Sequence, residues 1–376
     1  MKFLLLLMTF FLLLSGCSSD PQPVAPPETD PPFLETQPTT TEAPDPIQLL
    51  MESMSLEEQV GQLFLVRCNN ETASEDIAAY HPGGFVLFGV DFENQTPESV
   101  TQTIHQYQQS SKIPLLIAVD EEGGTVTRVS RYPAFRETAF PSPRSLYNQG
   151  GMELVLETEA EKVKLLSSLG INVNLAPVCD ITTDPDAFLY DRSLGQDATT
   201  TSLFISETVG IMQEHHVGST LKHFPGYGNN ADTHIGIAVD SRSLADLESL
   251  DLIPFQAGID AGADAVMVSH TFVQCLDPNL PASLSPAVHQ YLRREMDFDS
   301  VIMTDDLVME AITDEYGAEE AAVLAVLAGN DMLCSTEYAV QYEAVLDAVL
   351  TGRIDYDLIH QAVRRILQWK QELGLI

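Results

Sequence analysis

The chain has 376 residues, with 55 acidic and 18 basic side chains and a formal net charge of −37 at pH 7. This excess of negative charge repels a phosphate backbone and argues against nucleic acid as a partner. With 44% hydrophobic residues, the chain can bury the core of one large α/β barrel or of two smaller domains.

Residues 1–17 have the pattern of an export signal. Lys2 precedes an apolar run from Phe3 to Leu14, which only Thr9 interrupts. Such a run is short for a membrane-spanning helix and typical of a signal peptide. It ends in Leu14-Ser15-Gly16-Cys17, which resembles the lipobox of bacterial lipoproteins. The resemblance implies lipidation at Cys17; a plain signal peptide is the alternative. We expect an exported protein held by acyl chains at the outer face of the bacterial cell membrane, with no spanning helix.

Residues 18–46 alternate proline with threonine and acidic or amide side chains. Almost nothing in this segment can be buried, so we expect a disordered, Pro/Thr-rich tether. The remaining residues, 47–376, show neither an internal repeat nor a second domain boundary. We therefore interpret them as a single catalytic domain.

Within this domain, short apolar runs alternate with segments of helical periodicity. The expected strands are 63–66, 85–88, 115–119, 171–175, 218–221, 265–268, 301–303 and 331–334. The expected helices are 97–110, 152–169, 201–215, 244–261, 285–296, 318–328, 337–350 and 355–373. Ser285 before Pro286 is typical of a helix N-terminus, and Gly170 of the residue that follows a helix.

This alternation predicts an α/β fold, a (β/α)₈ TIM-type barrel, because short apolar runs are typical of strands buried on both faces of a parallel sheet. A doubly wound open sheet is the alternative. That fold usually has fewer repeats and a phosphate-binding fingerprint, which this sequence lacks.

The four cysteines beyond Cys17 are widely spaced and suggest no disulfide framework. They are Cys68, Cys179, Cys275 and Cys334. Three lie in or beside apolar runs, so we expect structural free thiols that behave as small hydrophobic side chains. Their spacing fits no metal site.

In a barrel, functional side chains follow the carboxyl ends of the strands. The ionisable residues in these places are Asp120, Glu121, Glu122, Arg128, Asp180, Asp191, Arg192, Lys222, His223, Asp232, His234, His270, Asp305 and Asp306. They predict a polar pocket for a small molecule at one rim of the barrel.

Three of these positions suggest acid–base or nucleophilic chemistry. Asp305 ends a buried strand, where a carboxylate acts as a nucleophile, a base or a cation ligand. His234 lies two residues after Asp232 on a Gly/Pro-rich loop, which is the spacing expected of an acid–base dyad. A metal site is the competing interpretation, but the histidine spacings fit no zinc motif, so we expect no metal.

Arg128, Arg192 and Lys222 are scarce cations in a very acidic chain. They suggest fixed hydrogen-bond donors for an oxygen-rich ligand. Their alternative role is to neutralise neighbouring aspartates, and the two roles are compatible.

Several motifs together resemble glycoside hydrolase family 3, in its β-N-acetylhexosaminidase branch, over about residues 50–373. The motifs are Gly83-Gly84-Phe85-Val86-Leu87-Phe88, Val119-Asp120-Glu121-Glu122-Gly123-Gly124 with Arg128, Asp191-Arg192-Ser193-Leu194-Gly195, Lys222-His223-Phe224-Pro225-Gly226 with Asp232-Thr233-His234, and Val301-Ile302-Met303-Thr304-Asp305-Asp306-Leu307.

The resemblance implies a TIM-type barrel and a retaining double displacement through a covalent glycosyl-enzyme. It implies Asp305 as nucleophile, His234 as acid/base and Asp232 as the partner of His234. The positions that hold sugar hydroxyls would be Asp120, Arg128, Arg192, Lys222 and His223. No cofactor is implied.

The implied substrate is an oligosaccharide or muropeptide ending in β-linked N-acetylglucosamine, and we expect a monomer. Phosphorolysis of the same bond and silent sugar binding are the alternative functions. Tyr227 and Thr125 depart from the family pattern, because a second histidine and a basic residue are common at these positions. These two departures bear on the leaving-group preference more than on the chemistry.

Overall fold

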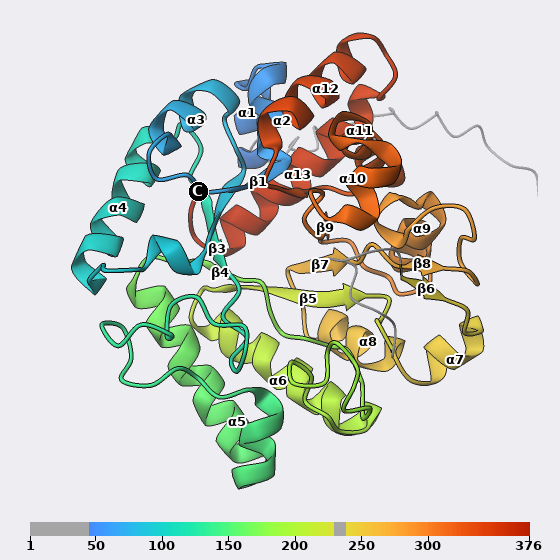
Figure 1. Cartoon of the computed structure of the whole chain (residues 1–376). Coiled ribbons are helices and arrows are strands. Elements are labelled where there is room, and N and C mark those ends of the chain that lie inside the picture. Colours follow the sequence, from blue (N-terminus) through green and yellow to red (C-terminus); the bar gives the residue numbers. More distant parts are fainter. Residues whose placement is uncertain (1–44, 229–237) are drawn as a thin grey trace, which may run out of the picture. The chain divides into compact units, whose positions relative to one another are not determined.

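A computed structural model describes residues 45–228 and 238–376. Eight parallel strands form one sheet that curls into a barrel, with helices around it (Figure 1). In sheet order the strands are β10 (Leu333–Ser335), β1 (Phe64–Arg67), β2 (Gly84–Leu87), β3 (Leu116–Val119), β4 (Val173–Asn174), β5 (Gly218–Phe224), β7 (Ala265–Val268) and β9 (Val301–Thr304).

The barrel closes between its last two strands. Met303 of β9 bridges Met332 in parallel, and Thr304 N donates to the carbonyl oxygen of Met332 at 3.1 Å. On its other side β10 pairs with β1. The predicted (β/α)₈ barrel and all eight predicted strands are therefore confirmed, and the open doubly wound sheet is excluded.

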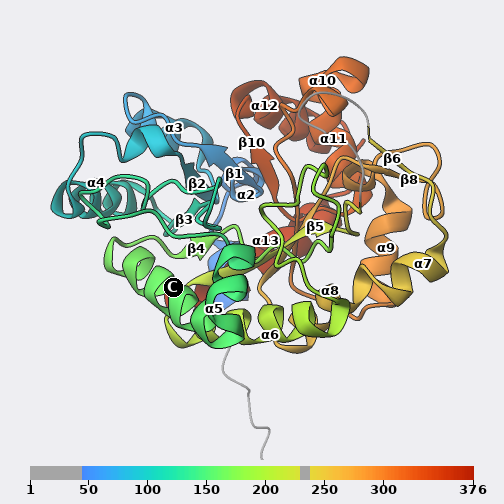
Figure 2. The same cartoon turned by 60° about the horizontal axis from the view of Figure 1, so that its bottom comes forward.

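The helices surround the strands in both views (Figures 1 and 2). They are α1 (Pro46–Glu52), α2 (Leu56–Gln62), α3 (Ala73–Tyr80), α4 (Pro97–Ser110), α5 (Pro143–Ser168), α6 (Ala198–Glu214), α7 (Leu244–Ser249), α8 (Leu252–Asp260), α9 (Pro286–Arg294), α10 (Glu310–Tyr316), α11 (Ala318–Ala328), α12 (Tyr338–Leu350) and α13 (Tyr356–Glu372). A small parallel pair, β6 (Val239–Asp240) and β8 (Phe272–Val273), lies outside the barrel sheet.

The helix ends follow the sequence signals. Ser285 caps α9 by accepting the N–H of Val288, and Gly170 follows α5 with a φ of +84°. The predicted helix 244–261 is two helices, α7 and α8. Pro254 has no N–H to donate to Leu250, so an unbroken helix is disfavoured there.

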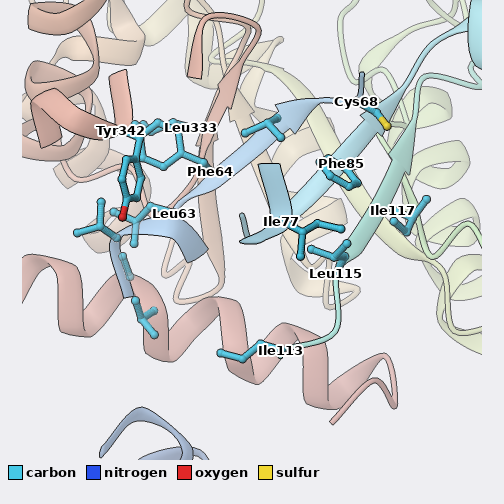
Figure 3. Packing of buried hydrophobic residues seen from close by; sticks show 14 of the residues in the cluster. Leu63, Phe64, Cys68, Ile77, Phe85, Ile113, Leu115, Ile117, Leu333 and Tyr342 are labelled. Atoms are coloured by element: carbon cyan, nitrogen blue, oxygen red, sulfur yellow. The ribbon is translucent and has the colours of Figure 1, made fainter. Parts of the chain in front are cut away.

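Two apolar layers hold the barrel together. The outer layer lies between sheet and helices and contains Phe64, Phe85 and Ile117, with Tyr342 from α12 packed edge-on against Phe64 (Figure 3). Strand neighbours alternate, so Leu65 belongs instead to the cluster inside the barrel.

The four described cysteines are free thiols, as predicted. Cys68, Cys179 and Cys334 are buried, and Cys275 is exposed. Among the described residues, no helix is long and apolar enough to cross a membrane. The predicted signal, Cys17 and nearly all of the predicted tether lie outside the described residues.

Candidate active site

A cavity of about 640 Å³ opens at the carboxyl ends of the barrel strands. Its wall contains Arg67, Phe88, Asp120, Thr125, Val126, Arg128, Phe188, Arg192, Lys222, His223, Tyr227, Met267, Asp305, Asp306, Val308, Met309 and Thr336, among others. Seven of the predicted rim residues meet here: Asp120, Arg128, Arg192, Lys222, His223, Asp305 and Asp306. These seven residues share one polar pocket, whereas the other described rim residues, Glu121, Glu122, Asp180, Asp191 and His270, do not line it.

A second cavity of similar volume lies around residues 181–183, 196–197 and 239–242. Of the predicted site residues that the structure describes, none lines it. We therefore place the candidate active site in the cavity at the strand ends.

Lys222 and His223 are part of β5, which runs to Phe224. The expectation that the strand ends at residue 221 and leaves them in a loop is therefore wrong. Successive residues of a regular strand face opposite sides, yet both of these side chains reach the cavity. The reason is local irregularity: the pairing with β7 shifts register between Leu221 and Phe224. The Lys222–His223 and Phe224–Pro225 peptide bonds are cis.

Buried ion pairs organise one wall of the cavity. Lys222 Nζ lies 2.7 Å from Asp120 Oδ1 and 2.6 Å from Glu122 Oε1. Arg192 binds the same Glu122 carboxylate with two nitrogens, Nε at 2.9 Å and a terminal nitrogen at 2.7 Å. Glu122 therefore pairs with both cations and fixes where each presents its remaining N–H groups, while Asp120 supplies the second negative charge.

The charges of this network are mutually stabilised. Burial alone would raise the pKa of the Glu122 carboxyl, but Arg192 and Lys222 outweigh burial and hold that pKa well below its usual range. Burial likewise opposes the charge on Lys222, and Asp120 and Glu122 reverse the effect and raise its pKa. Glu122, Arg192 and Lys222 are thus all charged at neutral pH.

His223 is fixed by partners on both ring nitrogens. Its Nδ1 lies 2.8 Å from the buried Asp180 carboxylate, and its Nε2 lies 3.1 Å from a guanidinium nitrogen of Arg192. A carboxylate only accepts and a guanidinium only donates, so we assign the proton to Nδ1. Asp180 also accepts the backbone N–H groups of His223 and Tyr227, at 2.9 and 2.7 Å.

Arg128 is held through its backbone and by an aromatic ring. Its N–H donates to the buried Glu121 carboxylate at 2.7 Å, and its guanidinium lies 5.5 Å from the Phe88 ring centroid. The guanidinium of Arg67 lies 4.2 Å from the same centroid and also binds Asp91 at 2.9 Å. Two cations therefore flank one ring at the cavity wall.

Asp305 follows β9 directly and lines the cavity, as predicted. The backbone N–H of Asp306 donates to Asp305 Oδ1 at 2.8 Å. The Asp306 carboxylate accepts from Val308 N at 3.1 Å and from Thr336 Oγ1 at 2.6 Å. Burial raises the pKa of Asp306.

Asp232 and His234 lie outside the described residues, so their predicted pairing has no structural account here. The two departures from the family motifs are both described. Tyr227 is buried against His223, with ring centroids 5.4 Å apart, and Thr125 lies at the cavity wall. Within residues 45–228 and 238–376, no group of three or more His, Cys, Asp and Glu side chains is arranged to hold a metal ion.

From the sequence, Glu122 and Asp180 were placed at the rim without a role, and Arg67 was not singled out. Glu122 and Asp180 anchor the predicted sugar-holding residues, and Arg67 ends β1 at the cavity. Arg67 could have been predicted as a site residue because it lies at the end of a strand. For Glu122, the signal was that scarce buried cations need a counter-ion nearby.

The model of the glycosyl hydrolase family 3 N-terminal domain matches residues 55–369. The chain is a member of glycosyl hydrolase family 3. The motifs that line the cavity are therefore those of a family 3 enzyme, and the predicted family and enzyme class are confirmed.

Relatives agree with this assignment. A beta-hexosaminidase of Nitrosomonas eutropha is 31% identical over 317 residues, covering 79% of this chain and 88% of that protein. Beta-hexosaminidase LpqI of Mycobacterium tuberculosis is 30% identical over 329 residues, covering 84% of this chain and 83% of that protein.

Solved structures of family 3 share the fold. A β-N-acetylglucosaminidase from a Paenibacillus species superposes with a TM-score of 0.80 at 34% identity, over 86% of this chain and 63% of that one. The M. tuberculosis LpqI structure superposes with a TM-score of 0.79 at 28% identity, over 86% of this chain and 96% of that one. This chain thus spans less than two thirds of the Paenibacillus chain and nearly all of the mycobacterial one.

Proposed function

We propose that this protein is an exo-acting, retaining β-N-acetylhexosaminidase that hydrolyses terminal β-linked N-acetylglucosamine. The observation that carries the proposal is the placement of Asp305 in one cavity with the Asp120–Lys222–Glu122–Arg192 network. A carboxylate nucleophile beside fixed donors and acceptors suits an oxygen-rich sugar ring. Relatives named beta-hexosaminidase and β-N-acetylglucosaminidase support this choice of sugar.

Asp120, Lys222 and Arg192 are charged and preoriented before substrate arrives. Asp120 accepts hydrogen bonds from sugar hydroxyls, while Lys222, Arg192 and Arg128 donate them. Because Glu122 and Asp120 together balance the charges of Lys222 and Arg192, binding a neutral sugar requires no new charge compensation. A substrate that lacks a hydroxyl would leave one of these groups unpaired, which provides discrimination.

In the first chemical step, an oxygen of Asp305 forms a bond to the anomeric carbon as the bond to the leaving oxygen breaks. His234, assisted by Asp232, gives a proton to that oxygen. In the second step the same histidine takes a proton from water, whose oxygen replaces Asp305 at the anomeric carbon. Each cycle restores both groups and releases the sugar with its original stereochemistry.

We further propose that the protein is exported and anchored through a lipid on Cys17, with residues 18–46 as a tether. A bacterial surface location suits the turnover of wall-derived muropeptides or the scavenging of glycans that end in N-acetylglucosamine. The anchor is the only membrane contact in this proposal.

The deciding experiment uses full-length protein in detergent with aryl β-glycosides that differ only at the 2-position. We expect release of the aryl group from the N-acetylglucosaminide and at least a tenfold lower kcat/KM for the glucoside. Proton NMR of the first product should show the β-anomer. Formation of sugar 1-phosphate in phosphate buffer would indicate phosphorolysis, and binding without aryl release would leave only the sugar-binding function.

A further inference from the structure

His270 is fully buried behind the strand end that carries Asp305. Strands β7 and β9 pair in parallel with Val268 opposite Thr304, so His270 and Asp306 follow at equivalent positions. His270 Nε2 lies 3.0 Å from the carbonyl oxygen of Asp306. A carbonyl oxygen only accepts, so this nitrogen carries a proton and donates it.

The second ring nitrogen fixes the orientation of the imidazole. His270 Nδ1 lies 2.7 Å from the hydroxyl oxygen of Ser283, which is itself buried. The backbone of Ser283 is held as well, because its N–H donates to Ser269 O at 3.0 Å and its carbonyl accepts from Asn330 Nδ2 at 2.8 Å. The ring is thus tied on both sides to rigid parts of the barrel.

Asp306 links His270 to Asp305 through hydrogen bonds. Its carbonyl is held by His270, and its carboxylate by Thr336 Oγ1 at 2.6 Å and Val308 N at 3.1 Å. Between these anchors, the N–H of Asp306 donates to Asp305 Oδ1 at 2.8 Å. The Asp306 N–H is therefore one of the contacts that orient the Asp305 carboxylate.

We propose that His270 is a positioning residue for the nucleophile. It holds the Asp306 carbonyl, which keeps the Asp306 N–H on one oxygen of Asp305 and orients that carboxylate toward the anomeric carbon. The inference rests on the proposed role of Asp305. His270 neither gains nor loses a proton in the step: the Asp305–carbon bond forms, the carbon–leaving-group bond breaks, and the proton for the leaving oxygen comes from elsewhere. A misplacement of about 1 Å in such a group costs about 100-fold in rate.

The test compares His270→Gln with His270→Met in the full-length protein. The two side chains have similar length, but only glutamine retains an N–H donor for the Asp306 carbonyl. His289→Met is the matched control. His289 is also buried, and its Nδ1 lies 2.8 Å from a carbonyl oxygen, but that oxygen belongs to Ser285, the N-cap of its own helix α9, and not to the Asp305–Asp306 segment.

The measurement is covalent labelling by a 5-fluoro derivative of N-acetylglucosaminyl fluoride, a general trap for retaining glycosidases. Peptide mass spectrometry locates the adduct, and the rate constant and the final stoichiometry are recorded separately. A merely structural role would lower the stoichiometry, whereas a positioning role lowers the rate constant at full stoichiometry.

We expect His270→Met to lower the labelling rate constant by about 10- to 100-fold with complete labelling of Asp305. His270→Gln should recover most of the loss, and His289→Met should match wild type. A wild-type rate constant for His270→Met, or equal losses in the Met and Gln variants, would overturn the inference.

The outcomes also separate this inference from the proposed function. If the wild-type protein is labelled at a residue other than Asp305, or is not labelled at all, both the positioning inference and the proposed function are overturned. Labelling at Asp305 that is indifferent to His270 overturns only the positioning role. If His270→Met does not fold, Ser283→Ala decides, because it frees the ring while keeping His270; an unchanged rate constant there contradicts the inference.

Discussion

Replacing Glu122 by glutamine should damage both stability and catalysis. Glu122 is 3% exposed, and its carboxylate makes three contacts of 2.6 to 2.9 Å with Lys222 and Arg192. Glutamine keeps the shape but leaves two buried cations with less compensation. Breaking a buried ion pair in this way costs about 3–5 kcal/mol. Because Lys222 and Arg192 also face the cavity, we expect kcat/KM to fall by at least 100-fold.

Asp331→Asn provides a matched control at the other end of the barrel. Asp331 is also a buried carboxylate with two cationic partners, Arg293 and Arg365, and it precedes β10 and does not line the cavity. Loss of the Asp331 charge should lower the free energy of unfolding by an amount similar to that for Glu122→Gln.

Denaturant unfolding and kinetics per folded molecule, on an aryl N-acetylglucosaminide, separate the two variants. Both should lose stability, but only Glu122→Gln should lose kcat/KM. If Glu122→Gln unfolds more easily yet keeps wild-type kinetics, the ion-pair network only stabilises the fold, and our reasoning about sugar binding is wrong.

Three further predictions concern single side chains. Asp305→Ala should abolish aryl N-acetylglucosaminide turnover while leaving thermal unfolding nearly unchanged, and retained turnover would remove Asp305 as nucleophile. His234→Ala should slow substrates with poor leaving groups far more than activated aryl glycosides, and equal losses would count against its role as the acid. Burial lowers the pKa of Lys370 from 10.5 to about 7. The unfolded chain therefore binds more protons between these values, so this group makes stability rise as pH increases from about 7 to 10.5. Lys370→Met should remove that part of the rise, as thermal unfolding at pH 6.0 and 9.5 would report, and an unchanged pH dependence would contradict the shift.

The strand pattern could be predicted because strands buried on both faces leave continuous apolar runs. Runs such as 115–119 and 265–268 have no solvent face to interrupt them, and they became β3 and β7. The helices α1, α2, α3 and α10 were missed because each has only seven or eight residues. Such short segments contain too few turns for the 3.6-residue period to be recognised.

The site residues could be predicted from their place at strand ends, but their partners could not. Lys222 lies in β5 and Glu122 follows β3, and β4 lies between these two strands in the sheet. Their contact therefore depends on the curvature of the barrel. The irregular register at the end of β5, which brings His223 to the same wall, also leaves no mark on the apolar pattern. Pairing and register are properties of the closed barrel, and a linear sequence does not display them.

The closure between β9 and β10 bears on how the protein is made. β10 is the last strand of the chain, and it completes the wall beside Asp305: Cys334 N donates to the hydroxyl of Thr304 at 3.1 Å, and Thr336 holds Asp306. During synthesis the nucleophile is therefore produced well before its surroundings exist. A chain that ends before β10 would carry the family motifs through Asp305 and still lack a formed site. The residues from β10 onward are therefore required for activity, although none of them belongs to the family motifs named above.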